Sequence, residues 1–267
     1  MTDATATDVA PGDTGAAGRY LYIASVVFLC AWVIVPIYFL LSNTLSSPET
    51  VNRFPQPFWP AFGLGSRNSF AGFAGMLTAL KNSVLVAAMT MVMSILIGAP
   101  AGYALSRFEF PGKGLFRLLI LLTRAFPLPL LALPLAVMFI QTGLDDTAFG
   151  LALVHTTLAI PFAVLITFSL FSGIPIELEE AAWTLGCTRL TAFTKVVLPL
   201  ILPGITASAI FAFVISWNEV FAAAVLTIEN RTLTAFLLQN LDTSPLHLKF
   251  AGGFILVVPA LIFIFAV

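Results

Sequence analysis

The sequence predicts an all-α integral membrane protein with six transmembrane helices. Of its 267 residues, 59% are hydrophobic and only 9% are charged. A water-soluble domain of this length cannot hide so much apolar surface, because part of any domain must face water. Several apolar runs also approach or exceed the roughly 20 residues that a helix needs to cross a bilayer. Together these observations predict a chain that crosses the membrane several times.

Unbroken apolar runs such as SVLVAAMTMVMSILIGAPAGYAL, residues 83–105, predict helices rather than strands. Where water is absent the backbone must satisfy its own hydrogen bonds, so only helices and closed barrels cross membranes. A barrel would need alternating segments of about ten residues, and these runs do not alternate. The six predicted spans are residues 20–41, 83–106, 115–140, 151–171, 200–226 and 250–267.

The first predicted span follows a short polar segment. Residues 1–19 are mostly small, polar and acidic, so we expect a disordered cytoplasmic tail there, with the transmembrane domain covering residues 20–267. The segment lacks the basic start of a secretory signal, so the apolar run after it is expected to be an uncleaved span. In the third span, Pro127, Pro129 and Pro134 predict a kink or an interruption.

Basic residues in the short loops give the predicted orientation. The loop after the second span carries Arg107, Lys113 and Arg117, whereas the loop at residues 141–150 carries no basic residue. Short loops rich in Lys and Arg are typical of the cytoplasmic side. The amino terminus and residues 173–200 are therefore predicted to be cytoplasmic.

The motifs of several function classes are absent from the sequence. The segment FPGKG lacks the glycine spacing and the following Ser or Thr of a phosphate-binding loop, and neither HExxH nor GxSxG occurs. His155 and His247 lie in different regions, which excludes a histidine-rich metal site, and the net charge of −1 implies no nucleic-acid partner. We therefore expect neither an enzyme acting alone nor a cofactor bound by this chain.

The loop GIPIELEEAAWTLGCTRLTAFTKVVLPL, residues 173–200, is unusually acidic for so apolar a chain. Three glutamates fall near the start of a predicted short helix, where they complement the positive end of the helix dipole. Pro175 suits its first turn, and Gly186 suits the left-handed conformation that ends a helix. A second short helix is expected at 188–198, interrupted by Pro199 and Pro203. The residues alone leave two readings open, an ordinary connector and a docking helix for a cytoplasmic partner.

The spacing within this loop resembles the EAA loop of binding-protein-dependent ABC importer permeases. The family pattern is EAA, three residues, Gly, nine residues, and then Ile-x-Leu-Pro. Residues 180–182, Gly186 and residues 196–199 match it in register, although Leu185 stands where the commoner form has Asp. The segments YALSRFEFPGK, residues 103–113, and WNE, residues 217–219, are similar to the carbohydrate-uptake, maltose-permease-like group. The three matches follow the family's order over about residues 83–225.

This resemblance implies a type I ABC importer permease fold in a bacterial plasma membrane, and a coupling helix seated in a cleft of an ATPase subunit. ATP and Mg would be bound by that partner, which fits the missing phosphate loop. The other implied partners are a second permease subunit, a second ATPase subunit and an extracytoplasmic solute-binding protein, with lipid around the spans. The implied ATPase-coupling residues are Glu179, Glu180, Ala181, Ala182, Gly186, Leu198 and Pro199. Ala181 and Ala182 are expected on the docking surface.

Ionisable residues inside predicted spans are costly and are therefore candidates for function. Asn218 and Glu219 are either a polar anchor at the outer interface or contacts for a sugar or the binding protein. Arg124 is expected to face either the pathway or a partner helix, and to lie too far from Glu219 for an ion pair. For His155, helix packing is favoured over ligand binding.

We therefore predict a permease subunit of an ATP-driven sugar importer that forms half of the translocation pathway. The alternatives are an ABC permease for a non-sugar solute and a proton- or sodium-coupled secondary transporter, which would need no ATPase. A membrane-embedded enzyme is disfavoured by the absence of a catalytic constellation.

Overall fold

The computed structural model describes residues 16–60 and 75–265, and every element in those ranges is helical. Most of the predicted disordered tail lies outside these residues, and α1 already begins at Ala16. Five helices are long and apolar enough to cross a membrane, and a bent helix pair forms a sixth candidate span. The elements are α1 (Ala16–Leu45), α2 (Pro48–Val51), α4 (Met76–Arg107), α5 (Lys113–Leu122), η1 (Thr123–Ala125), α6 (Leu128–Thr142), α7 (Ala148–Ser172), α8 (Glu177–Thr184), α9 (Arg189–Ala192), η2 (Phe193–Val197), α10 (Leu198–Asn218), α11 (Phe221–Leu226), α12 (Leu233–Gln239) and α13 (Leu246–Phe265).

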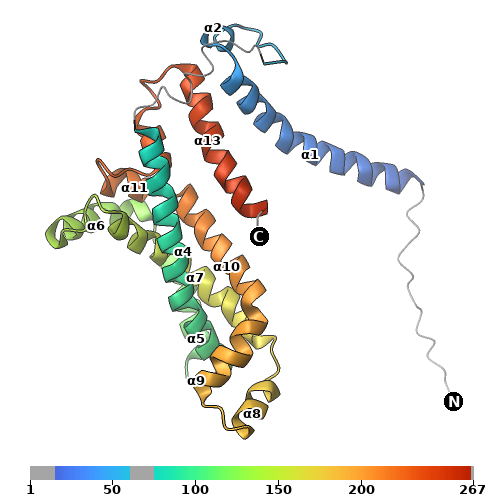
Figure 1. Ribbon diagram of the computed structural model, residues 1–267, viewed down its shortest axis with the longest axis vertical. Helices are drawn as coiled ribbons and strands as arrows, with labels where there is room; N and C mark the ends of the chain where they lie inside the picture. Colours follow the sequence, from blue (N-terminus) through green and yellow to red (C-terminus); the bar gives the residue numbers. More distant parts are fainter. Residues whose placement is uncertain (1–15, 61–74, 266–267) are drawn as a thin grey trace.

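The centre of the fold is the packing of α4, α7 and α10 along the long axis of the molecule (Figure 1). Close approach of α4 and α7 depends on Gly98, since a Cβ there would lie only 2.6 Å from the Cβ of Ala163. The Thr167 hydroxyl, on α7, donates to the Gly98 carbonyl oxygen at 2.9 Å. Small residues let helix backbones approach closely in a membrane, and Gly98 does so here.

The third span is interrupted, as predicted, but only at Pro127, since Pro129 and Pro134 lie within α6. Residues 113–125 and 128–142 form two helical segments at 85° to each other. Phe126 and Pro127 between them are extended, with ψ of 117° and 123°. Proline lacks an N–H and disfavours helical geometry in the residue before it, which accounts for the break. As a result, α6 projects sideways from the bundle beside α11 (Figure 1).

The fifth span differs from the prediction at both ends. Pro199 and Pro203 do not interrupt the helix, which runs continuously over Arg189–Asn218. The π-helical turn η2 precedes Pro199, and the Leu198 N–H donates to the carbonyl of Phe193. Pro199 directly follows this wider turn, so its missing N–H falls where the helix hydrogen bonds change register. At the other end the predicted limit, residue 226, is wrong, because α10 ends at Asn218 and residues 221–226 form the separate helix α11.

The first span stands apart from the bundle. α1 contacts α13 near its own carboxyl end, where Leu40 lies against Gly253, and then slants away (Figure 1). The most apolar window of α1 is 0% buried within the chain, and Tyr20, Trp32 and Ile34 are among its exposed side chains. Such a surface is stable only against lipid or other apolar helices, so α1 depends on the membrane rather than on this bundle.

Candidate functional site

The acidic helix α8 lies outside the spans, at the end of the bundle where α4 finishes (Figure 1). Its first turn holds Glu177, Glu179 and Glu180, as predicted from the helix dipole. Pro175 precedes the cap residue Ile176 rather than occupying the first turn. The helix has only eight residues, so packing and caps rather than propensity must hold it in place.

Gly186 ends α8 in the predicted left-handed conformation, with φ of +87°. The Gly186 N–H donates to the carbonyl of Trp183 at 2.9 Å, and the Cys187 N–H donates to that of Ala182 at 3.0 Å. This pair of bonds is the Schellman motif, which satisfies two carbonyls that the helix end would leave unpaired. A Cβ at Gly186 would meet nothing within 4 Å, so backbone conformation is the constraint at this position.

The inner face of α8 is fixed by a buried carboxylate. Glu179 is 1% exposed, and its Oε1 accepts a hydrogen bond from Arg107 Nε at 2.5 Å. The Tyr103 hydroxyl donates to the other carboxylate oxygen. Arg107 also donates to the carbonyl of Ile174, in the loop before α8, at 3.0 Å. Two residues of α4 therefore hold both α8 and the turn that precedes it.

The predicted coupling residues divide between two faces of α8. Glu180 and Ala181 are exposed, and so is Leu185, which follows the helix. Glu179 and Ala182 are instead buried, so the expectation that Ala182 lies on the docking surface is wrong. Residues three apart share a helix face, and this face packs on η2 and α4. At the start of α10, Leu198 is partly buried and Pro199 is exposed.

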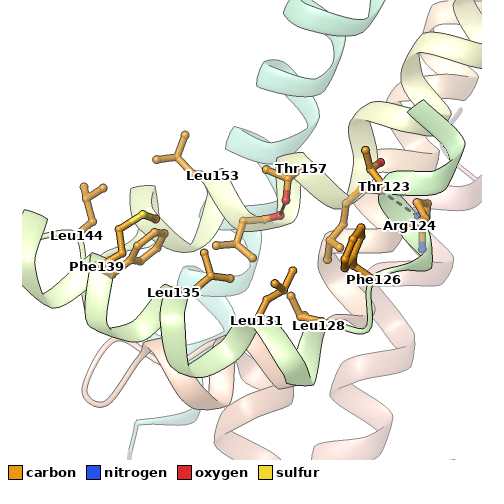
Figure 2. Close-up of a pocket in the computed structure, with 13 residues that line it drawn as sticks. Thr123, Arg124, Phe126, Leu128, Leu131, Leu135, Phe139, Leu144, Leu153 and Thr157 are labelled. Carbon is orange, nitrogen blue, oxygen red and sulfur yellow. Dashed lines mark hydrogen bonds between the residues drawn. The ribbon is translucent and has the colours of Figure 1, made fainter. Parts of the chain in front are cut away.

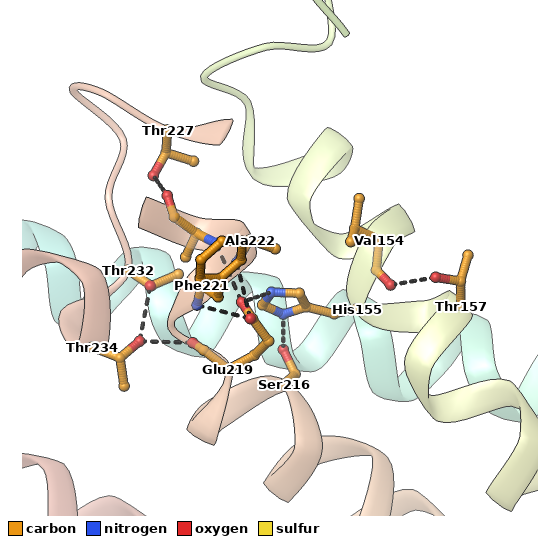
Figure 3. Close-up of polar contacts among 11 residues, drawn as sticks. Val154, His155, Thr157, Ser216, Glu219, Phe221, Ala222, Thr227, Thr232 and Thr234 are labelled. Carbon is orange, nitrogen blue, oxygen red and sulfur yellow. Dashed lines mark hydrogen bonds and ion pairs between the residues drawn. The ribbon is translucent and has the colours of Figure 1, made fainter. Parts of the chain in front are cut away.

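A second polar site lies at the break between α10 and α11 (Figure 3). Glu219 Oε1 accepts the N–H groups of Phe221 and Ala222 at 2.8 and 2.9 Å, and Oε2 accepts that of Ala223 at 3.2 Å. These are the first N–H groups of α11, which no residue within that helix can satisfy. The carboxylate therefore caps a new helix at the point where the fifth span ends.

His155 joins this site from the neighbouring helix α7. Its Nε2 lies 3.2 Å from Glu219 Oε2, and its Nδ1 lies 2.8 Å from the Ser216 hydroxyl (Figure 3). Ser, His and Glu in contact resemble a hydrolytic triad, but His155 is 0% and Ser216 4% exposed, so a substrate in solution cannot reach them. The contacts instead pack α7 against α10, as favoured for His155 from the sequence.

The two residues before Glu219 make different contacts. Asn218 is exposed and donates to the carbonyl of Val214 in its own helix at 2.9 Å. Trp217 is buried, and its indole N–H donates to the carbonyl of Leu256 on α13 at 3.1 Å. The WNE segment therefore combines a helix anchor, an exposed amide and a helix cap.

Arg124 lies just before the break in the third span, beside a cavity of about 560 Å³ (Figure 2). Its Nη1 donates to the carbonyl of Leu158 on α7 at 3.0 Å, and its guanidinium lies 4.3 Å from the ring centre of Phe162. Leucines, phenylalanines and two threonines form most of the cavity wall, so a single cation borders an otherwise apolar space. Among the described residues, no ion pair between Arg124 and Glu219 is present.

Sequence reasoning missed the partner of the buried Glu179 and the loop contacts of Asp146. Arg107 was interpreted as a loop charge, although it lies in the last turn of α4 and meets Glu179 across 72 residues of sequence. Asp146 was not considered, yet its Oδ1 accepts the N–H groups of residues 228–230. The available signal was the rarity of charge in an apolar chain, which indicates that each charged residue needs a partner.

Comparison with known proteins identifies the family. Residues 94–267 match the family model described as the binding-protein-dependent transport system inner membrane component. The chain belongs to this family. It is therefore a permease, the membrane subunit of an importer that depends on a binding protein, and not an ATPase-bearing chain.

Two relatives of the permease have names that describe carbohydrate transport. A trehalose transport system permease protein, SugB of Mycobacterium tuberculosis, is 31% identical over 87% of each chain. A diacetylchitobiose uptake system permease protein, NgcG of Streptomyces coelicolor, is 33% identical over 70% of this chain and 62% of that one.

Solved structures support the fold of the permease. A chain of a bacterial ABC transporter for the import of the acidic polysaccharide alginate superposes with a TM-score of 0.71 at 22% identity, covering 93% of this chain and 95% of that one. A chain of an alginate transporter in complex with its alginate-bound periplasmic protein gives a TM-score of 0.68 at 13% identity, covering 92% and 91%. The predicted type I ABC importer permease fold is confirmed.

Proposed function

We propose that this permease is one of two membrane subunits of an ATP-driven sugar importer, with α8 as its docking helix for an ATPase subunit. The observation that carries the docking role is the position of α8, a capped helix outside the spans with Glu180, Ala181 and Leu185 exposed. A fixed, projecting helix is suited to enter a cleft of a partner. The partner ATPase would bind ATP and Mg, and this chain would bind neither.

The proposed orientation places α8 and the amino terminus in the cytoplasm. The end of the bundle at α8 carries Arg107, Lys113, Arg117 and Arg189, and an excess of basic residues is typical of the cytoplasmic side. The break at Glu219 then lies toward the extracytoplasmic side, where the solute-binding protein would deliver its ligand. A second permease and two ATPase subunits would complete the assembly.

We propose a di- or oligosaccharide as the solute, on the strength of the relatives for trehalose and diacetylchitobiose. Asn218 and Arg124 are the proposed pathway residues, because both are exposed on this chain. Glu219 would shape the pathway by capping α11, since its carboxylate is already bonded to three backbone N–H groups and His155.

Uptake into vesicles tests the function. The complex assembled with the products of the neighbouring genes is reconstituted with its binding protein, and labelled trehalose and diacetylchitobiose are used as probes. We expect uptake that requires MgATP and is lost when only the ATPase partner is inactivated. Uptake driven by a proton or sodium gradient without ATP would instead establish a secondary transporter. ATP-dependent uptake of a solute that is not a sugar would retain the importer and overturn the sugar assignment.

Docking is tested with Ala181→Arg, because Ala181 is exposed on α8. A long charged side chain on the docking surface should reduce the amount of ATPase that copurifies with the permease by about tenfold, the equivalent of about 1.4 kcal/mol. Thr142→Arg, an exposed position at the end of α6, is the matched control and should retain the ATPase. Equal recovery of the ATPase with both variants would contradict the docking role.

A further inference from the structure

The ion pair of Arg107 and Glu179 joins a spanning helix to the proposed docking helix. We propose that this pair ties α8 to α4, so that the two helices move as one body when the ATPase displaces α8. The inference rests on the proposed docking of α8 and assigns Arg107 and Glu179 as positioning residues for coupling. Glu179 would then act inside the permease, whereas Glu180 would act on the ATPase.

The contacts around the pair form a connection at three points. Arg107 binds Glu179 on α8 and the carbonyl of Ile174 in the loop before it. Tyr103, one turn earlier on α4, binds the second carboxylate oxygen of Glu179. The carboxylate and the guanidinium both carry directional bonds, so rotation of α8 relative to α4 would break several of them together.

Burial makes this connection different from a surface ion pair. The Glu179 and Arg107 side chains are 1% and 10% exposed. Water and salt screen such a pair far less than an exposed one, and removal of one partner leaves a buried charge without compensation. The pair Lys113–Glu109 lies just beyond α4 and offers a contrast, because its glutamate is 86% exposed.

The cavity beside the ion pair explains why polar bonds are needed to hold α8 against α4. A cavity of about 560 Å³ lies between α4, α8 and η2, and its wall includes Tyr103, Arg107, Glu179 and Trp183. Arg189 enters the same cavity and stacks on Trp183, with its guanidinium 5.4 Å from the ring centre. Close packing therefore does not hold α8 against α4 on this side. The polar bonds to Glu179 supply the constraint instead.

A distance measurement in the assembled transporter tests the tie without knowledge of the solute. Spin labels are placed at Thr184, in the exposed last turn of α8, and at Phe108, directly after α4. Cys30 and Cys187 are first replaced by Ser. Double electron–electron resonance then gives the distance distribution without nucleotide and after trapping with MgATP and vanadate.

In the otherwise unchanged chain we expect one narrow distribution that is the same in both nucleotide states. Glu179→Gln should broaden the distribution and shift its mean between the states, because the isosteric amide removes the ion pair. The ATPase should still copurify, since Glu179 is 1% exposed. Glu109→Gln is the matched control and should behave as the unchanged chain. Arg107→Lys, which keeps a cation, should preserve the narrow distribution better than Arg107→Gln.

Three results would overturn the proposal. If the distance distribution of the unchanged chain already shifts between the nucleotide states, α8 and α4 move separately. If the distance distribution of Glu179→Gln stays narrow and unshifted, the ion pair does not tie the helices. The copurification assay then still decides docking by itself. If the ATPase fails to copurify even with the unchanged chain, the proposed function and this inference fall together.

Discussion

Two glutamates, the buried Glu179 and the partly buried Glu219, hold opposite regions of this permease in different ways. The Glu219 carboxylate is bound mainly by backbone N–H groups two to four residues ahead, and His155 is its partner from α7. Glu179 is bound by Tyr103 and Arg107, both more than 70 residues away on α4. The first arrangement fixes the start of a helix, and the second fixes the position of one helix on another.

The comparison shows what each region tolerates. A carboxylate that caps its own chain keeps most of its partners whenever the local turn forms. A carboxylate that relies on a distant guanidinium keeps its main partner only while two helices stay in register. We therefore expect substitutions at the Glu179 site to lower the free energy of unfolding more than those at Glu219. Their effects should also extend further through the structure.

The largest effect is expected for Arg107→Ala. It leaves the Glu179 carboxylate buried without its cation, which costs about 3–5 kcal/mol in the free energy of unfolding. Unfolding of the detergent-solubilised permease by denaturant measures the change, and Arg117→Ala is the control, because Arg117 is only partly buried, stacks on Phe168 and has no ion-pair partner among the described residues. A loss no larger than that of the control would show that the buried pair contributes little.

A smaller and more local effect is expected for Glu219→Ala. Loss of the capping carboxylate should cost about 1–3 kcal/mol, since helix caps and hydrogen bonds to charged groups contribute in that range. Hydrogen exchange should increase at the N–H groups of residues 221–223 but not in α4. Glu229→Ala is the control, because Glu229 is exposed. Increased exchange throughout α4 would mean that the Glu219 site acts globally after all.

The smallest effect is expected for Gly186→Ala, at the end of α8. A residue with a Cβ in the left-handed conformation costs about 1–2 kcal/mol, and Cβ would clash with nothing at this position. Gly173→Ala is the matched control, because its φ of −79° suits alanine. Thermal unfolding compares the two, and equal stability would show that Gly186 is free to leave the left-handed region.

The sequence was sufficient where structure follows from short-range chemistry. Long apolar runs predicted the spans, Pro127 predicted the break in the third, and Gly186 predicted the end of α8. Each of these depends on composition or on the conformational limits of one residue. The fifth span was predicted too long for the same reason, since residues 221–226 are as apolar as a span and only the carboxylate of Glu219 starts a new helix there.

Only the tertiary structure decided which face of α8 points inward. The letters EEAA place Glu179, Glu180, Ala181 and Ala182 in about one helical turn, and nothing in their order shows which two are buried. Packing of α8 on α4 and η2 makes that choice, and it turns Glu179 toward Arg107. The sequence by itself thus determined where the helices begin and break, because those limits are local. The pairing of buried charges required the fold, because it depends on which distant helix lies beside each one.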